Sequence, residues 1–178
     1  MDFFQSLASI LRSELTAKHY RIPPGWTDDE VVEGYVNLVR RQIPLVPREV
    51  CRSAELVCPP EQASGLQELF RKVAAGEPVK PHQSRSVKKP SFNDGLFTDW
   101  GIQHFHLGTS IENDGFVNRT GPVLFALCKG MKFYAIQIYE HGAWAKPEVV
   151  RLLRSNWPTV TAPFELKGIK PITPEFDE

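Results

Sequence analysis

The chain has 178 residues, of which 42% are hydrophobic and 11% are aromatic, so one domain can bury a proper core without a disulfide framework. Lysine plus arginine equals aspartate plus glutamate at 21 each, so bulk charge does not predict a nucleic-acid or membrane partner. No apolar run reaches the roughly 18 residues that a membrane span needs, and the N-terminus lacks the features of a signal peptide. We therefore expect a cytoplasmic protein without a membrane partner.

Two helices are predicted at the N-terminus. Hydrophobic residues recur at helical spacing between residues 2 and 19, which indicates an amphipathic helix. Thr27 and Glu30 have the spacing of a capping box, in which each side chain accepts a backbone N–H from the other end of the turn. We therefore predict a second helix from this cap to about Gln42.

A third helix and a change of composition follow. Residues 60–75 place hydrophobic side chains on one helical face, whereas residues 44–60 fit either a short helix or an extended connector. Residues 77–92 combine prolines with basic residues, which is typical of a linker or long loop. We predict that this segment joins a helical N-terminal region, 1–76, to a β-sheet domain, 93–178.

The periodicity of the second half of the chain shortens to that of strands. Residues 101–108, 122–129 and 132–141 are predicted strands, separated by a glycine-containing polar segment and a tight turn. A final helix is predicted over 146–156, and one more extended strand near 164–170. The predicted fold class is α+β, with N-terminal helices followed by an antiparallel β-meander and a C-terminal helix.

Alternation along these strands predicts a polar face that contains three histidines. His104 and His106 point to the same side of the first strand, because side chains two residues apart share a face. In the third strand, one face is predicted to carry Gln137, Tyr139 and His141, and the other Tyr134, Ile136 and Ile138. If neighbouring strands pair in chain order, the polar faces coincide, and Arg119 reaches the same rim.

This set of side chains suits metal-independent cleavage of RNA. A histidine titrates near neutral pH, so a pair of them supplies a general base and a general acid. We expect His104 or His106 to deprotonate the ribose 2′-hydroxyl and His141 to protonate the leaving oxygen. Arg119 would stabilise the charge on the phosphoryl group, and Tyr139 would orient or assist. The hypothesis requires neither a metal nor another cofactor.

Metal ligation is the alternative chemistry for the same histidines. A His-x-His pair on a strand presents both rings on one side, and His141 with Asp99 or Glu112 could complete a site. The chain would then be a metal-dependent hydrolase that uses His104, His106 and His141. Only the His-x-His pair is fixed by spacing, so the remaining ligands stay open.

Two non-catalytic interpretations are also open. Histidines are common on the exposed face of an antiparallel sheet, where Tyr139 would be a cross-strand packing partner. The aromatic residues around Trp144 and Trp157 could instead form the surface of a protein-binding module, such as an immunity or antitoxin-like partner.

The basic segment offers candidate substrate-binding residues. Four cations lie within ten residues of one another, and they could follow a phosphate backbone: Lys80, Arg85, Lys88 and Lys89. A solvated flexible linker has the same composition, so this segment does not decide the function.

The C-terminal half carries three blocks that resemble a known family. These are 93-NDGLFTDWGIQHFHLGT-109, RTGPVLFALCKG and KFYAIQIYEHGAW. They resemble a family of uncharacterised bacterial proteins found in accessory genomic regions. The order of helices followed by an antiparallel meander is also similar to that of the RelE-like ribonuclease toxins. That resemblance implies a toxin-type endoribonuclease with RNA as substrate and a cognate antitoxin or inhibitor protein as partner.

Overall fold

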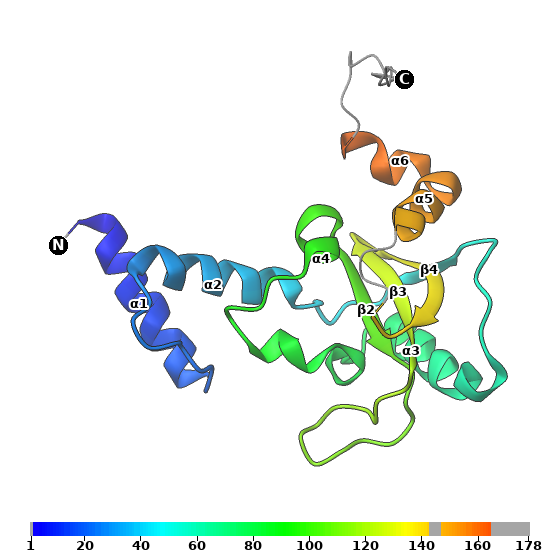
Figure 1. Ribbon diagram of the computed structural model, residues 1–178, viewed down its shortest axis with the longest axis horizontal. Helices are drawn as coiled ribbons and strands as arrows, with labels where there is room; N and C mark the ends of the chain where they lie inside the picture. The colour runs from blue at the N-terminus through cyan, green and yellow to red at the C-terminus, as the bar shows by residue number, and fades with distance from the viewer. Residues whose placement is uncertain (1, 143–146, 165–178) are drawn as a thin grey trace, which may run out of the picture.

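A mixed β-sheet with helices on both faces forms the body of the protein, and a helical hairpin extends from it (Figure 1). The computed structural model describes residues 2–142 and 147–164. The strands are β1 (Glu49–Arg52), β2 (Ile102–His106), β3 (Pro122–Lys129) and β4 (Lys132–Glu140). The helices are α1 (Phe3–Ala17), α2 (Asp28–Arg41), α3 (Ala63–Ala75), α4 (Gly95–Trp100), α5 (Pro147–Asn156) and α6 (Pro158–Thr161).

The predicted helices are confirmed, with ends set by their caps. At the start of α2, the backbone N–H of Glu30 donates to the Thr27 hydroxyl over 3.3 Å, and the Thr27 N–H donates to the Glu30 carboxylate over 2.7 Å. Gly76 ends α3 in the left-handed conformation, at a φ of 71°. Helices α1 and α2 pack on each other through an apolar cluster of their own, which includes Leu15 and Val31.

The sheet differs from the predicted meander by one strand. Strands β2, β3 and β4 pair antiparallel in chain order, as predicted. However, β1 pairs in parallel with β4, so the strand order is β1-β4-β3-β2 and the sheet is mixed. Strand β1 lies inside the ambiguous segment 44–60, for which the extended alternative is therefore correct at these four residues.

A β-bulge changes the side-chain phase of β4. The register shifts between Phe125 and Ala126 of β3, and the extra residue opposite them is Ile136. As a result, Tyr134 and Ile136 pack in one core cluster and Ile138 in the other, so the prediction that these three share a face is wrong. The phase of β4 beyond the bulge is as predicted.

Both faces of the sheet are covered. Helix α3 packs on one face with Phe105 and Leu124, and Gly65 of α3 lies so close to the backbone of Leu107 that a Cβ there would be 1.7 Å from its carbonyl oxygen. Helices α5 and α6 cover part of the other face, where Ile102 and Phe125 are buried. The face that carries the histidines is therefore an interior face and not a polar surface.

The segment 77–92 and the short helix α4 were not predicted in this form. Two 3₁₀ turns, Lys80–His82 and Arg85–Lys88, interrupt the segment, and Gln83 forms an isolated bridge with Phe105 at the edge of β2. Helix α4 begins after Asp94, whose carboxylate accepts the Phe97 N–H over 3.2 Å. These elements lie beside the histidine face and limit its contact with solvent.

Two further predictions concern the C-terminal segment. The final helix is confirmed from Pro147, whereas residue 146 is outside the described residues. The strand predicted near 164–170 is also largely outside them, and Phe164 itself belongs to a 3₁₀ turn, Ala162–Phe164. In the described ranges, no helix has both the length and the apolar character needed to cross a bilayer.

Candidate functional site

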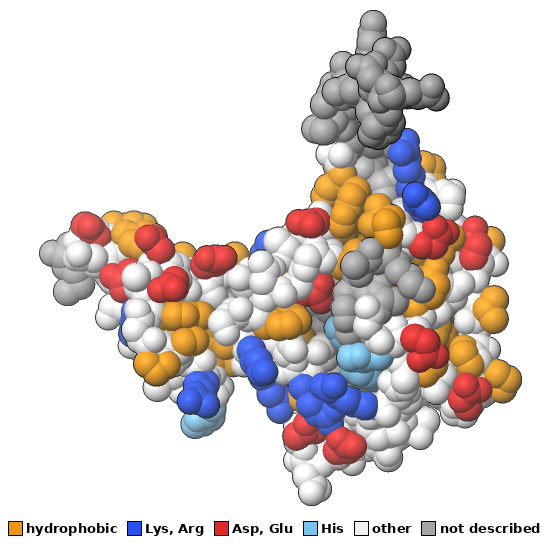
Figure 2. Space-filling model, in the orientation of Figure 1, with side chains coloured by type: hydrophobic (Ala, Val, Ile, Leu, Met, Phe, Trp, Pro, Cys, Tyr) orange, Lys and Arg blue, Asp and Glu red, His pale blue; other side chains and the backbone are white. Residues whose placement is uncertain are grey.

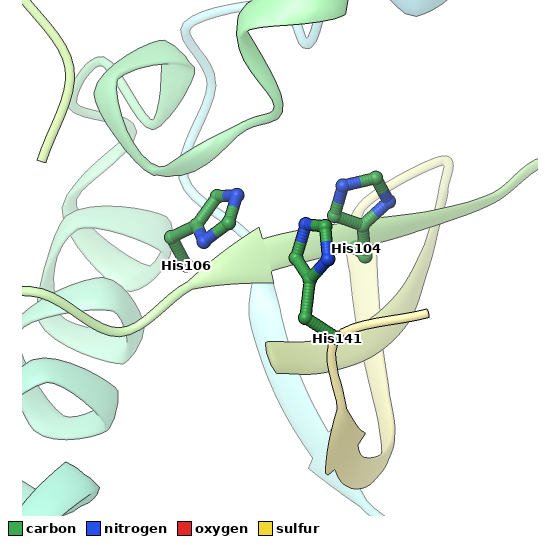
Figure 3. Close-up of side chains that lie close together, drawn as sticks. All are labelled: His104, His106 and His141. Atoms are coloured by element: carbon green, nitrogen blue, oxygen red, sulfur yellow. The ribbon is translucent and has the colours of Figure 1, made fainter. Parts of the chain in front are cut away.

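Three histidines meet at the end of the sheet, as the strand alternation predicted (Figure 3). His104 and His106 project from β2, and His141 follows directly after β4, where its backbone N–H donates to the Gly121 carbonyl over 2.8 Å. The ring centroids are 5.8 Å apart for His104 and His106, 6.1 Å for His104 and His141, and 5.6 Å for His106 and His141. One ring nitrogen of each lies within 4.8 Å of the others.

The burial of this cluster is the main difference from the expected wet surface. The side chain of His104 is 7% exposed and that of His106 only 2%, whereas His141 is exposed. Neither ring nitrogen of His106 has a hydrogen-bond partner in the described part of the chain. Because a buried polar group without a partner costs about 1–3 kcal/mol, the fold holds this histidine in an unfavourable state.

The environment keeps both buried imidazoles neutral. Burial lowers the pKa of His104 to about 3, and the neighbouring His106, His141 and Arg119 add to the shift. Burial likewise lowers the pKa of His106 to about 4, with Arg119 as the next largest cause. Neutral imidazole is the form that binds a metal ion, and it is not the form that donates a proton.

Two side chains from outside the sheet lie against the buried pair. The Nδ1–H of His82 donates to the backbone carbonyl of His106 over 2.9 Å, and burial lowers the pKa of His82, so this imidazole is also kept neutral. The Asp94 carboxylate that caps α4 approaches His104, with Oδ2 4.0 Å from Nδ1. That distance is too long for a hydrogen bond, and burial raises the pKa of Asp94.

A pocket of about 390 Å³ opens in front of the cluster. Besides His104 and His141, its walls include Ser84, Ser86, Phe92, Asn93, Asp94 and Arg119. Arg119 is exposed and makes no ion pair or hydrogen bond with any residue that the structure describes. In Figure 2, histidine side chains are visible in a hollow beside a cluster of Lys and Arg side chains.

Of the two other residues of the predicted acid/base site, Arg119 lines the pocket and Tyr139 does not. Arg119 faces the cluster, because its charge contributes to the lowered pKa of both buried histidines. Tyr139 packs against Phe125, with ring centroids 6.1 Å apart, and does not line the pocket. Burial raises the pKa of the Tyr139 phenol.

The predicted basic residues do not belong to the pocket walls that the structure describes. The Arg85 guanidinium pairs with the carboxylates of Glu112 and Asp114. The Lys88 ammonium donates to the Asp114 carbonyl over 3.0 Å. Lys89 is exposed, and Lys80 lines a different cavity, near Tyr20 and Leu38. The charge of Arg85 is therefore largely neutralised within the protein.

The additional metal ligands suggested from the sequence are not at the cluster. Among the described residues, the group of candidate ligands consists of the three histidines, without Asp99 or Glu112. Of the two tryptophans proposed for a binding surface, Trp157 packs against Tyr134 at 5.1 Å, and residue 144 lies outside the described residues.

Sequence reasoning missed most of the pocket wall. Asp94 could have been found, because an aspartate three residues before the buried Phe97 is a helix-start signal. No local pattern identifies Ser84, Ser86 or Phe92 as neighbours of β2, since they approach it through tertiary packing. Comparisons with protein-family models, curated proteins and solved structures give no significant match.

Proposed function

We propose that the protein is a metal-dependent hydrolase in which His104, His106 and His141 hold a divalent transition-metal ion. One observation carries the proposal: His106 is buried without a hydrogen-bond partner for either ring nitrogen among the described residues, at a point where three imidazole nitrogens converge within 4.8 Å. A metal ion would satisfy the buried nitrogen, because a neutral imidazole is a common ligand of zinc and related ions.

The surroundings of the cluster support a catalytic centre more than a structural one. Three histidines leave a four-coordinate ion one position for water or substrate, as catalytic zinc sites do. When bound, such an ion acts as a Lewis acid and lowers the pKa of water to near neutrality. His141 is exposed and lines the pocket, so substrate can reach this position, and Arg119 can bind a negatively charged group.

The metal-independent ribonuclease predicted from the sequence uses the same histidines and stays a prediction. With pKa values of about 3 and about 4, His104 and His106 are deprotonated at neutral pH and are weak bases. General acid–base catalysis works best with a pKa near the operating pH. The burial of the pair therefore favours the metal-dependent proposal.

Metal titration tests the proposal directly. The chelator-treated protein is titrated with Co²⁺, followed by its visible absorption, and then with Zn²⁺ in competition. We expect one ion per chain. His141→Asn should weaken binding by more than about 100-fold, because loss even of an outer-shell partner costs about 10–100-fold. His19→Asn is the matched control, since His19 is also exposed but belongs to the end of α1.

Hydrolysis is then measured with the activated diester bis(4-nitrophenyl) phosphate and with RNA. Activity should be lost with the chelator and restored by the metal. Activity that persists in chelator but is lost in His106→Ala would instead establish the metal-independent ribonuclease. A protein that binds no ion, or that binds it equally in His141→Asn, would refute the metal site.

A further inference from the structure

We propose that the pocket in front of the histidine cluster binds one nucleotide unit, with its base against Phe92 and its phosphate at Arg119. This inference rests on the hydrolase proposed above, for which it names the substrate class. The pocket volume of about 390 Å³ lies in the range of roughly 300–1,000 Å³ that is usual for small-molecule sites. This volume offers room for one nucleotide unit.

Phe92 is placed as a stacking platform. The Arg41 guanidinium lies 5.3 Å from the centre of the Phe92 ring, while the ring also lines the pocket. Arg41 is only 5% exposed, and its Nη1 donates to the Lys89 carbonyl over 3.1 Å, so the ring is supported from behind by a fixed group. A half-buried aromatic ring at the wall of a polar pocket is suited to a nucleobase, which also has an apolar face.

The charges of the pocket set the orientation of the ligand. Arg119 acts on both buried histidines and has no carboxylate partner among the described residues. The Asp94 carboxylate instead lies beside His104, with Oδ2 4.0 Å from Nδ1. A phosphate is attracted by the Arg119 guanidinium and repelled by the Asp94 carboxylate, which lies against His104, so it belongs beside Arg119. The uncharged base then occupies the side of Phe92.

The remaining polar groups of the pocket wall suit a sugar and the edge of a base. Ser84, Ser86 and Asn93 bring two hydroxyls and an amide to the wall. The Asn93 side-chain carbonyl already accepts the Thr98 hydroxyl over 2.7 Å, which holds the amide in place. The pocket thus combines an aromatic side chain, hydrogen-bonding groups and a cation, which are the groups that a base, a sugar and a phosphate require.

Competition binding tests this assignment. A short fluorescein-labelled oligouridylate is bound to the protein, and adenosine monophosphate, ribose phosphate and inorganic phosphate are used as competitors. Phe92→Leu should weaken the binding of adenosine monophosphate at least about fivefold and leave the binding of ribose phosphate unchanged, because only the base stacks on the ring. Arg119→Gln should weaken both ligands. The matched controls are Phe3→Leu, at a ring 83% exposed on α1, and Arg151→Gln on α5, and both should bind like the wild type.

The outcomes separate this inference from the proposed function when the metal content of each preparation is measured. A protein that holds the ion but binds adenosine monophosphate no better than ribose phosphate overturns the nucleotide assignment alone. A protein that binds nucleotides through Phe92 but holds no ion overturns the hydrolase. Tighter binding of the oligouridylate than of adenosine monophosphate identifies a nucleic-acid strand as the source of the nucleotide, and the reverse identifies a free nucleotide.

Discussion

Acid should destabilise the metal-free protein through its buried histidines. In the unfolded chain a histidine has a pKa of 6.5, whereas in the folded protein the pKa values of His104 and His106 are about 3 and about 4. Above pH 6.5 both states are neutral, so these groups add no pH dependence. Below pH 6.5, the unfolded state takes up protons that the folded state does not. The free energy of unfolding therefore decreases as the pH is lowered from 6.5 to the folded pKa values.

The magnitude follows from the same values. Each pH unit in this window changes the free energy of unfolding by about 1.4 kcal/mol per histidine, so lowering the pH from about 8 to about 5 costs about 2 kcal/mol for each, and about 4 kcal/mol together. Urea denaturation of chelator-treated protein at the two pH values measures this change. In His106→Asn, the decrease in the free energy of unfolding between the two pH values should be about half as large. His82 is buried in the wild type and in the variant, so it contributes equally to both. Equal stability at both pH values, or an undiminished fall in His106→Asn, would refute the reasoning.

Two further predictions concern the cluster itself. His106→Leu should raise the free energy of unfolding of the metal-free protein by about 1–2 kcal/mol in urea denaturation, because it removes a buried polar group that has no hydrogen-bond partner in the described ranges, and it should abolish Co²⁺ binding. A destabilised variant would contradict this account. Asp94→Asn should keep the α4 cap, since asparagine caps equally well, but weaken Co²⁺ binding about tenfold if the carboxylate supports His104 when the metal is bound. An unchanged affinity would limit Asp94 to capping.

The parts of the fold that depend on local signals were predictable. Periodicity and caps identified the long helices, and the tight turn after Lys129 placed β3 beside β4. The parallel strand β1 gives no such signal, because its partner β4 lies about 80 residues further along the chain, and four residues are too few for a clear alternation. The bulge opposite Phe125 is likewise a consequence of packing, so strict alternation assigned Tyr134 and Ile136 to the face opposite the histidines, whereas they pack on the same face.

The composition of the histidine cluster was predictable, but its burial was not. The bulge lies on the far side of Gln137 from His141, so the alternation that joins His141 to His104 and His106 was unaffected. Burial depends on α4 and the 77–92 segment, which precede β2 in the chain and fold back against its histidine face without a local pattern that predicts this packing. For this reason the sequence favoured acid–base catalysis on an open face, whereas the buried cluster beside a pocket is the observation from which we propose a metal site.

The burial of His106 also bears on why the histidine is there at all. A core position beside β3 would be filled at lower free energy by a leucine or phenylalanine, and β2 already has such residues on its other face. The surrounding chain nevertheless fixes this strand, since His82 is itself buried in order to bond the His106 carbonyl. The fold maintains an unfavourable polar group in a defined geometry, next to a pocket whose arginine has no ion-pair partner among the described residues, and this is the stability cost expected of a functional site. Ligand binding at His106 would remove that cost.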